Sequence, residues 1–160
     1  MENFKIPSEA LRASRSTAYW EPYNGRINDS VSGWCANLIS DKEWFQIKFD
    51  TDHYVTAVAN QATSRGWVLE FTLAYSRGLG WFEYMENGTI KIFHRNNSDY
   101  SSEIVVSNLS FPVRAKMFRI YPKRAIRDTC LRLELYGCQG ESKKTERANK
   151  QTKKQTDKQK

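Results

Sequence analysis

The chain has little of the chemistry that enzymes and metal sites commonly use. Its two histidines, His53 and His94, are not spaced as two metal ligands on one helix or strand would be. No Cys-x-x-Cys pair and no Gly-x-Ser-x-Gly motif occurs. The Gly-Leu-Gly at residues 78–80 lacks the following helix and the Lys-Ser/Thr of a phosphate-binding loop. A pair of catalytic carboxylates is not recognisable from sequence spacing, because folding brings distant acidic residues together. We predict a non-catalytic protein without a metal ion or other cofactor.

Long apolar runs are also absent. No stretch of about 18 apolar residues, enough for a helix to span a bilayer, is present. Met1 does not begin a secretory signal peptide, because no charged and then apolar segment follows it. Taken alone, these absences are typical of a cytosolic protein. Asn-x-Ser/Thr sequons indicate a secreted protein if they are glycosylated. Four occur, at Asn28, Asn87, Asn96 and Asn108.

The composition suffices for one folded domain. With 39% hydrophobic and 13% aromatic residues, a chain of 160 residues can bury a single core. From Gln139 onward no large apolar residue occurs, which predicts a disordered tail over residues 139–160. Residues 141–160 hold eight Lys/Arg and three Asp/Glu, so most of the net charge of +7 lies there. The tail is either a solvated spacer or attracts polyanions and acidic membranes.

Apolar and polar residues alternate from residue 44 to residue 136, as is typical of half-buried strands. No segment shows a sustained helical period, and the Gly-bearing runs at residues 76–81 and 86–89 predict tight hairpins. The pattern predicts an all-β fold of seven or eight short antiparallel strands, a sandwich or a jelly roll. The predicted inward sets are Phe45, Ile47 and Phe49; Leu69, Phe71, Leu73 and Tyr75; and Leu131, Leu133 and Leu135.

A series of short motifs supports a more specific interpretation. In chain order they are IPSEALRAS, GRIN, GWCA, KEWFQIKFD, WVLEFTLAYS, GLGWFEY, RAKMFRIYP and CLRLELYGC. The series closely resembles the discoidin family, also called the coagulation factor V/VIII type C domain family, over roughly residues 4–138. The resemblance implies a distorted eight-stranded antiparallel jelly-roll barrel with protruding loops at one end. We assign this domain to residues 1–138 and the basic tail to residues 139–160.

The resemblance also bears on the three cysteines. In the family, the first cysteine of the closing strand commonly pairs with the cysteine of a Gly-x-Trp-Cys motif, which implies a disulfide between Cys35 and Cys130. The usual partner of the final cysteine precedes the segment that begins here with Met1, so Cys138 lacks it. Either Cys138 pairs between chains or its partner is missing through a truncated start, which we favour. A truncated start would also explain the missing signal peptide, and a disulfide implies an extracellular location.

In the family the binding surface lies on the loops at one end of the barrel, as expected of functional residues. The first loop holds Tyr19, Trp20 and Tyr23 around Pro22. Such an aromatic cluster stacks on a sugar, enters a bilayer interface, anchors a protein contact, or folds back to plug the barrel end. The loops correspond to residues 16–25, 28–33, 60–67 and 122–129, and the tryptophans expected in the core are Trp34, Trp44, Trp67 and Trp81.

Positive charge accompanies the aromatic residues. Lys123, Arg124 and Arg127 lie on the predicted loop before Cys130, and Arg65 is expected nearby. A cationic cluster beside exposed aromatic rings suits a phosphatidylserine head group, a sulfated glycan or an acidic protein face. An ordinary solvated basic loop is the alternative.

We therefore expect an extracellular, non-catalytic binding module for cell or matrix adhesion, which recognises a cell-surface glycan or an anionic phospholipid through these loops. Alternatives are a carbohydrate-binding module that delivers a fused hydrolase, a collagen- or protein-binding receptor ectodomain, and a spacer that binds nothing. The collagen-binding members carry Trp, Asp and Arg where this chain has Thr17, Asn28 and Thr63, which argues against collagen. No nucleic acid is expected, because no reading motif accompanies the basic tail. The sequence does not specify an oligomeric state.

Overall fold

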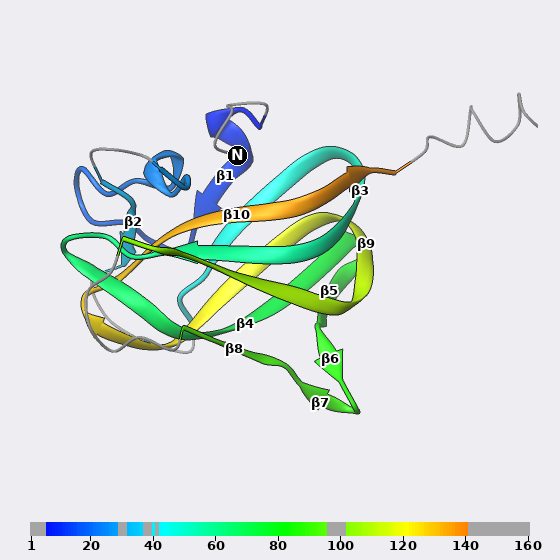
Figure 1. The fold of residues 1–160 in the computed structure, drawn as a ribbon. Coiled ribbons are helices and arrows are strands. Elements are labelled where there is room, and N and C mark those ends of the chain that lie inside the picture. The colour runs from blue at the N-terminus through cyan, green and yellow to red at the C-terminus, as the bar shows by residue number, and fades with distance from the viewer. Residues whose placement is uncertain (1–5, 29–31, 37–39, 41, 96–101, 141–160) are drawn as a thin grey trace, which may run out of the picture.

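The protein is an antiparallel β-structure in which one large sheet curls around its core (Figure 1). The computed structural model describes residues 6–28, 32–36, 40, 42–95 and 102–140. The main sheet has the order β2-β10-β3-β9-β4-β5, β1 pairs with β3, β8 pairs with β4, and β6 and β7 form a separate hairpin. The strands are β1 (Leu11–Ala13), β2 (Trp34–Ala36), β3 (Phe45–Gln61), β4 (Gly66–Gly78), β5 (Gly80–Glu83), β6 (Met85–Glu86), β7 (Thr89–Ile90), β8 (Ile92–His94), β9 (Ile104–Arg127) and β10 (Thr129–Gln139). The predicted all-β antiparallel class is confirmed.

Helical structure within the described ranges is limited to two short 3-10 turns, η1 (Ser8–Ala10) and η2 (Pro22–Asn24). None of the helices in these ranges is long and apolar enough to cross a membrane.

Two strands are far longer than the short strands that the sequence predicts. β3 has 17 residues and β9 has 24, and the two pair along most of their length. Their register shifts between Lys48 and His53 and again between Val55 and Ala57. Such irregularities bend a strand and increase its twist, so they let one long strand follow the curl of the sheet.

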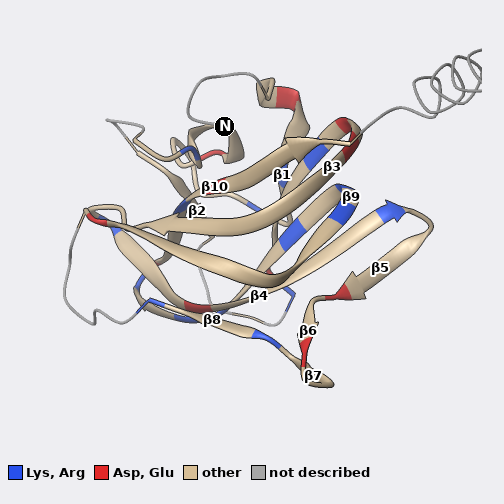
Figure 2. Cartoon of the chain, turned by 45° about the vertical axis from the view of Figure 1, so that its right-hand side comes forward, with Lys and Arg blue, Asp and Glu red and all other residues tan. Residues whose placement is uncertain are grey.

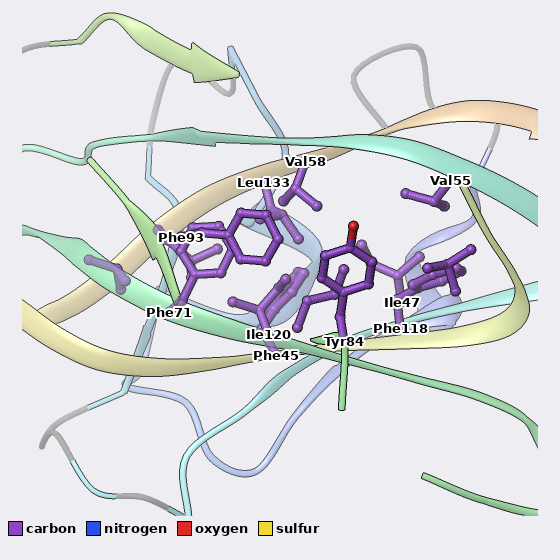
Figure 3. Close-up of a cluster of buried hydrophobic side chains, with 14 of the residues drawn as sticks. Phe45, Ile47, Val55, Val58, Phe71, Tyr84, Phe93, Phe118, Ile120 and Leu133 are labelled. Carbon is purple, nitrogen blue, oxygen red and sulfur yellow. The ribbon is translucent and has the colours of Figure 1, made fainter. Parts of the chain in front are cut away.

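The core lies on the concave side of this sheet, where side chains of β3, β4, β8, β9 and β10 point toward one another (Figure 3). Phe45 and Ile47 are almost completely buried, as their alternation predicts. Phe71 of β4 stacks on Phe93 of β8, with ring centroids 5.1 Å apart. Burial of each such side chain contributes about 1.5–3 kcal/mol, which makes this cluster the main stabilising feature of the scaffold.

The two predicted hairpins are confirmed. Asn87 (φ 51°) and Gly88 (φ 77°) occupy the turn between β6 and β7. Positive φ values at both central residues are what a type I′ hairpin turn requires, and Asn-Gly adopts them readily. The turn between β4 and β5 places Gly78 (φ 116°) and Gly80 (φ 77°) on either side of Leu79.

The predicted loop at residues 122–129 is wrong, because β9 continues to Arg127. Ala125 and Ile126 pair with Val68 and Trp67 of β4, so the charged side chains of this stretch project from a strand. The composition of residues 122–129 is typical of a turn, so their pairing with β4 was not predicted. The predicted start of the tail at residue 139 is also wrong, because Gln139 pairs with His53 as the last residue of β10 and the Gly140 amide donates a hydrogen bond to the Asp52 carbonyl at 2.7 Å. Residues 141–160 of the predicted tail lie outside the described residues.

Candidate functional site

The first predicted loop is fastened to β2 by backbone hydrogen bonds. The Thr17 amide donates to the Cys35 carbonyl at 2.9 Å, and the Cys35 amide donates to the Trp20 carbonyl at 3.1 Å. Cys35 is itself joined to Cys130 by the predicted disulfide, which is confirmed. The loop therefore rests on a covalently closed part of the sheet.

The aromatic residues of this loop do not fold back into the barrel end. Tyr19 is 87% exposed and Tyr23 is 50% exposed, whereas Trp20 is half-buried. Tyr19 adopts a left-handed backbone conformation (φ 69°), and its carbonyl accepts a hydrogen bond from Asn24 Nδ2 at 3.2 Å. A tyrosine held exposed in a disfavoured conformation is typical of a residue whose position serves binding rather than stability.

Arg65 joins this loop to the opposite side of the site. Its guanidinium lies over the Trp20 ring, 5.8 Å from the ring centroid, and its Nε forms an ion pair with Asp128. Both side chains of the pair are about one-third exposed, so a ligand can still reach them. The result is an aromatic surface beside one donor group and one acceptor group.

Gly66 explains how the ion pair forms across 63 residues of sequence. It begins β4 and lies so close to the Asp128 backbone that a Cβ atom would collide with the Asp128 carbonyl. The turn before it is closed by Thr63, whose Oγ1 donates to the Gly66 carbonyl at 2.8 Å. This close approach of two backbones brings the side chains of Arg65 and Asp128 into contact.

The predicted cations do not form one cluster. Arg127 (φ 58°) lies beside this site, with its guanidinium 5.9 Å from the centroid of the Trp67 ring. Arg124 lies three residues earlier on β9, which is about 10 Å along a strand. Its Nη1 pairs with Glu70 Oε1 at 3.0 Å, and the preceding residue, Lys123, is also exposed.

Much of the positive charge is therefore compensated locally. Figure 2 shows basic and acidic segments interspersed along the strands. Arg65 faces Asp128 and Arg124 faces Glu70. Sequence reasoning missed Asp128, although it lies within one of the predicted loop stretches, because only the cations of that stretch were considered. Its position before Thr129 and Cys130 gave no signal of an ionic partner so far away in sequence.

The outer face of the sheet holds an arrangement that the sequence did not predict. The Arg119 guanidinium lies between two tryptophan rings, 4.0 Å from the centroid of Trp44 and 4.1 Å from that of Trp81. Its Nε donates to Gln46 Oε1 at 2.9 Å. Of the four tryptophans expected in the core, Trp34 and Trp67 are buried, whereas Trp44 and Trp81 cover the outside of the sheet.

The remaining predicted site residues concern modification and redox chemistry. Asn28, Asn87 and Asn108 are exposed, and Asn96 lies outside the described residues. Cys138 is an exposed free thiol on β10. Within the ranges that the structure describes, no group of three or more His, Cys, Asp or Glu side chains is arranged to hold a metal ion.

Comparison with known proteins identifies the family. The profile of the F5/8 type C domain matches residues 10–135. The chain belongs to this family. Neuropilin-2 of Mus musculus is 33% identical over 147 residues, and the match covers 86% of this chain and 16% of that protein. Coagulation factor V of Sus scrofa is 31% identical over 147 residues, covering 86% of this chain and 6% of that protein.

Lactadherin of Rattus norvegicus is 29% identical over 154 residues, covering 86% of this chain and 35% of that protein. The F5/8 type C chain thus spans about a third or less of the length of these three relatives. Among solved structures, discoidin II of Dictyostelium discoideum superposes with a TM-score of 0.71 at 25% identity, covering 82% of this chain and 56% of that chain. The family 32 carbohydrate-binding module of Clostridium perfringens NanJ, solved with galactose, has a TM-score of 0.58 at 11% identity, covering 81% and 96%, and shows the fold alone.

Proposed function

We propose that this F5/8 type C domain is an extracellular, non-catalytic adhesion module that recognises a neutral glycan at the site formed by Tyr19, Trp20, Tyr23, Arg65 and Asp128. The observation that carries the proposal is the position of Arg65, which lies over the Trp20 ring and is paired with Asp128. The confirmed disulfide supports an extracellular location, because such bonds persist in oxidising compartments.

The chemistry of a sugar matches this combination of groups. Each hydroxyl both donates and accepts hydrogen bonds, and an Arg–Asp pair offers donors and acceptors side by side. The apolar face of a sugar ring packs on an aromatic ring, and exposed tyrosine or tryptophan supplies such a surface at low conformational cost. Because Asp128 compensates the charge of Arg65, the site suits a neutral ligand better than an anion.

An anionic phospholipid is the second candidate. Arg127 is exposed next to Asp128 in sequence, and Lys123 is exposed further along β9. Each basic residue near an acidic membrane contributes about 1 kcal/mol, so these residues together with an inserted Tyr19 would give detectable attachment. The paired state of Arg65 and Arg124 weakens this candidate.

Two further roles depend on protein context. Because carbohydrate-binding modules of similar fold occur in enzymes, for example in a family 31 glycoside hydrolase from Clostridium perfringens, this domain would deliver a hydrolase if one were fused to it. The second of these roles is that of a receptor ectodomain that binds collagen or another protein. We also propose that residues 141–160 act outside the domain proper and that Asn28, Asn87, Asn96 and Asn108 carry glycans.

The experiment compares binding of the oxidised full chain to a glycan array and to phosphatidylserine vesicles, each at low and high salt. We expect binding to a neutral glycan that changes little with salt, because no net charge is neutralised. Trp20→Ala and Asp128→Asn should each weaken it about tenfold or more, as loss of a stacked ring or of a charged hydrogen-bond partner does.

Tyr136→Ala is the matched control, because Tyr136 is another partly exposed aromatic residue, on β10. Vesicle binding that weakens with salt and is lost in Arg127→Ala would support the phospholipid candidate instead. Unchanged binding of every ligand by folded Trp20→Ala and Asp128→Asn would overturn the site assignment.

A further inference from the structure

An apolar groove lies at the end of β4 that is farther from the candidate site. β4 begins at Gly66, beside Asp128, and ends at Gly78, beside the groove. The groove has a volume of about 620 Å³ and is formed by β5, β6 and the adjoining parts of β4 and β9. Its apolar lining includes Tyr75, Trp81, Phe82, Met85, Phe111 and Val113.

Several of these apolar side chains are open to solvent. Phe111 is 67% exposed, Phe82 is 57% exposed and Met85 is 49% exposed. Beside them Leu79 is 91% exposed, because it occupies the tip of the turn between β4 and β5. A groove and a protruding leucine side by side are typical of an interaction surface, and aromatic residues, Met and Arg are the types enriched at protein interfaces.

The walls of the groove are held in place by contacts between lining residues and with side chains behind them. Trp81 stacks on Arg119 on the outer face of the sheet. Tyr84 is buried, and its hydroxyl donates to Glu86 Oε1 at 3.1 Å and accepts from the Phe111 amide at 3.3 Å. A preformed surface loses little conformational entropy on binding.

The charges at the rim decide which partner fits. Arg77 Nε donates to the Arg114 carbonyl at 2.9 Å, which leaves its two terminal nitrogens without a partner in the described part of the chain. Arg114 is already paired with Asp52 at 3.0 Å. Glu83 is exposed and, among the residues that the structure describes, forms no ion pair. The rim thus presents one unpaired cation at the end of β4 and one unpaired anion at the end of β5.

We propose that this groove is the interface of a symmetric dimer with a second copy of the chain. In a two-fold arrangement each patch meets the same patch of the partner, so Leu79 of one copy fills the groove of the other. Arg77 of each copy then pairs with Glu83 of the other, and both unpaired charges find a partner.

Other occupants fit less well. An acidic membrane would be repelled by Glu83, and residues 141–160 of the chain contain no large apolar residue that could fill the groove. Dimerisation at this end leaves both candidate glycan sites accessible. If the proposed function holds, a dimer binds a multivalent surface with the avidity of two linked sites. The dimer itself does not depend on glycan binding, so the two proposals fail separately.

The test measures the molar mass of the full chain by light scattering and sedimentation equilibrium over a range of concentrations. All proteins carry Cys138→Ser, because the exposed thiol could otherwise cross-link two chains. We expect a concentration-dependent dimer whose dissociation constant rises about tenfold or more in Leu79→Asp and in Phe111→Ser. Val106→Ser is the matched control, since Val106 is 51% exposed on β9 but does not line the groove.

A charge exchange separates the proposed pairing from a general effect on folding. Arg77→Glu alone and Glu83→Arg alone place like charges opposite each other and should weaken the dimer, whereas the double variant should restore it. A chain that stays monomeric at all concentrations would overturn the proposal. So would a dimer that tolerates Leu79→Asp and Phe111→Ser, or vesicle binding by the groove without dimerisation.

Discussion

Cys35 and Cys130 lie directly opposite each other in the antiparallel pairing of β2 with β10, and a disulfide joins them. The amide and the carbonyl of Cys35 also hold the loop that carries Tyr19 and Trp20. The bond therefore fixes both the closing strand of the sheet and the loop that forms one side of the candidate site.

Replacing both Cys35 and Cys130 by alanine should lower the free energy of unfolding by about 4–5 kcal/mol. The two residues are 95 apart in sequence, and the chain-entropy model gives a value of this size for a closed loop of that length. Denaturant unfolding monitored by tryptophan fluorescence measures the change. Cys138→Ser is the control and should leave the free energy of unfolding unchanged, because Cys138 is free and exposed. Equal stability of the double variant and the control would contradict the prediction.

Much of the scaffold could be predicted because burial imposes a period of two on each strand. Phe45, Ile47 and Phe49 were predicted to face inward and all three are buried. The Asn-Gly pair at residues 87–88 likewise predicts its own turn, since its backbone preference is local. The length of β9 was not predictable in this way, because a strand that crosses bulges loses its alternation and its polar stretches resemble loops.

The candidate site could be predicted only in part, for a related reason. Aromatic residues on a Pro-bearing loop are visible in sequence, and Tyr19 and Tyr23 are indeed exposed. Ion pairs between distant residues are not visible, so the pairing of Arg65 with Asp128 and of Arg124 with Glu70 was missed. Charge counting therefore favoured an anionic ligand, whereas the paired side chains favour a neutral one.

The backbone of Tyr19 predicts a trade between stability and binding. Its φ of 69° lies in the left-handed region, which asparagine tolerates better than tyrosine. Tyr19→Asn should therefore raise the free energy of unfolding by up to about 1 kcal/mol while weakening glycan binding. Tyr23→Asn is the matched control, because Tyr23 lies in η2 of the same loop and is also exposed. It should weaken binding without the gain in stability, and a gain of equal size there would contradict the interpretation of strain.

Gly66→Ala should damage both the fold and the site. The added Cβ would collide with the Asp128 backbone, so β4 and the end of β9 must separate at a cost of about 1–3 kcal/mol. The shift also pulls Arg65 away from Asp128, and glycan affinity should fall. Gly137→Ala is the control, because its Cβ would collide with the Tyr54 carbonyl far along β10. It should destabilise the fold and leave affinity per folded molecule unchanged, as titration by calorimetry would show.

Glu86 predicts how stability depends on acid. Lys91 Nζ lies 2.7 Å from Glu86 Oε2 and Ser110 Oγ lies 2.8 Å from Oε1. The hydrogen bond with Lys91, followed by that with Ser110, lowers the pKa of Glu86 from 4.5 to about 2. A carboxyl group whose pKa is lower in the folded state stabilises the protein above its unfolded pKa. That contribution should decline as the pH falls from about 4.5 to about 2.

Glu86→Gln should therefore lower stability near neutral pH and flatten the dependence of stability on pH between about 4.5 and 2. Denaturant unfolding at a series of pH values in this range measures both effects. Glu9→Gln is the control, since Glu9 is an exposed glutamate of η1 away from this cluster. Glu86 also accepts a hydrogen bond from Tyr84, and the Tyr84 hydroxyl accepts one from the Phe111 amide. Because Phe111 lines the groove, Glu86→Gln should in addition weaken the proposed dimer. Parallel acid profiles for wild type and Glu86→Gln would show that the carboxylate does not hold this part of the fold.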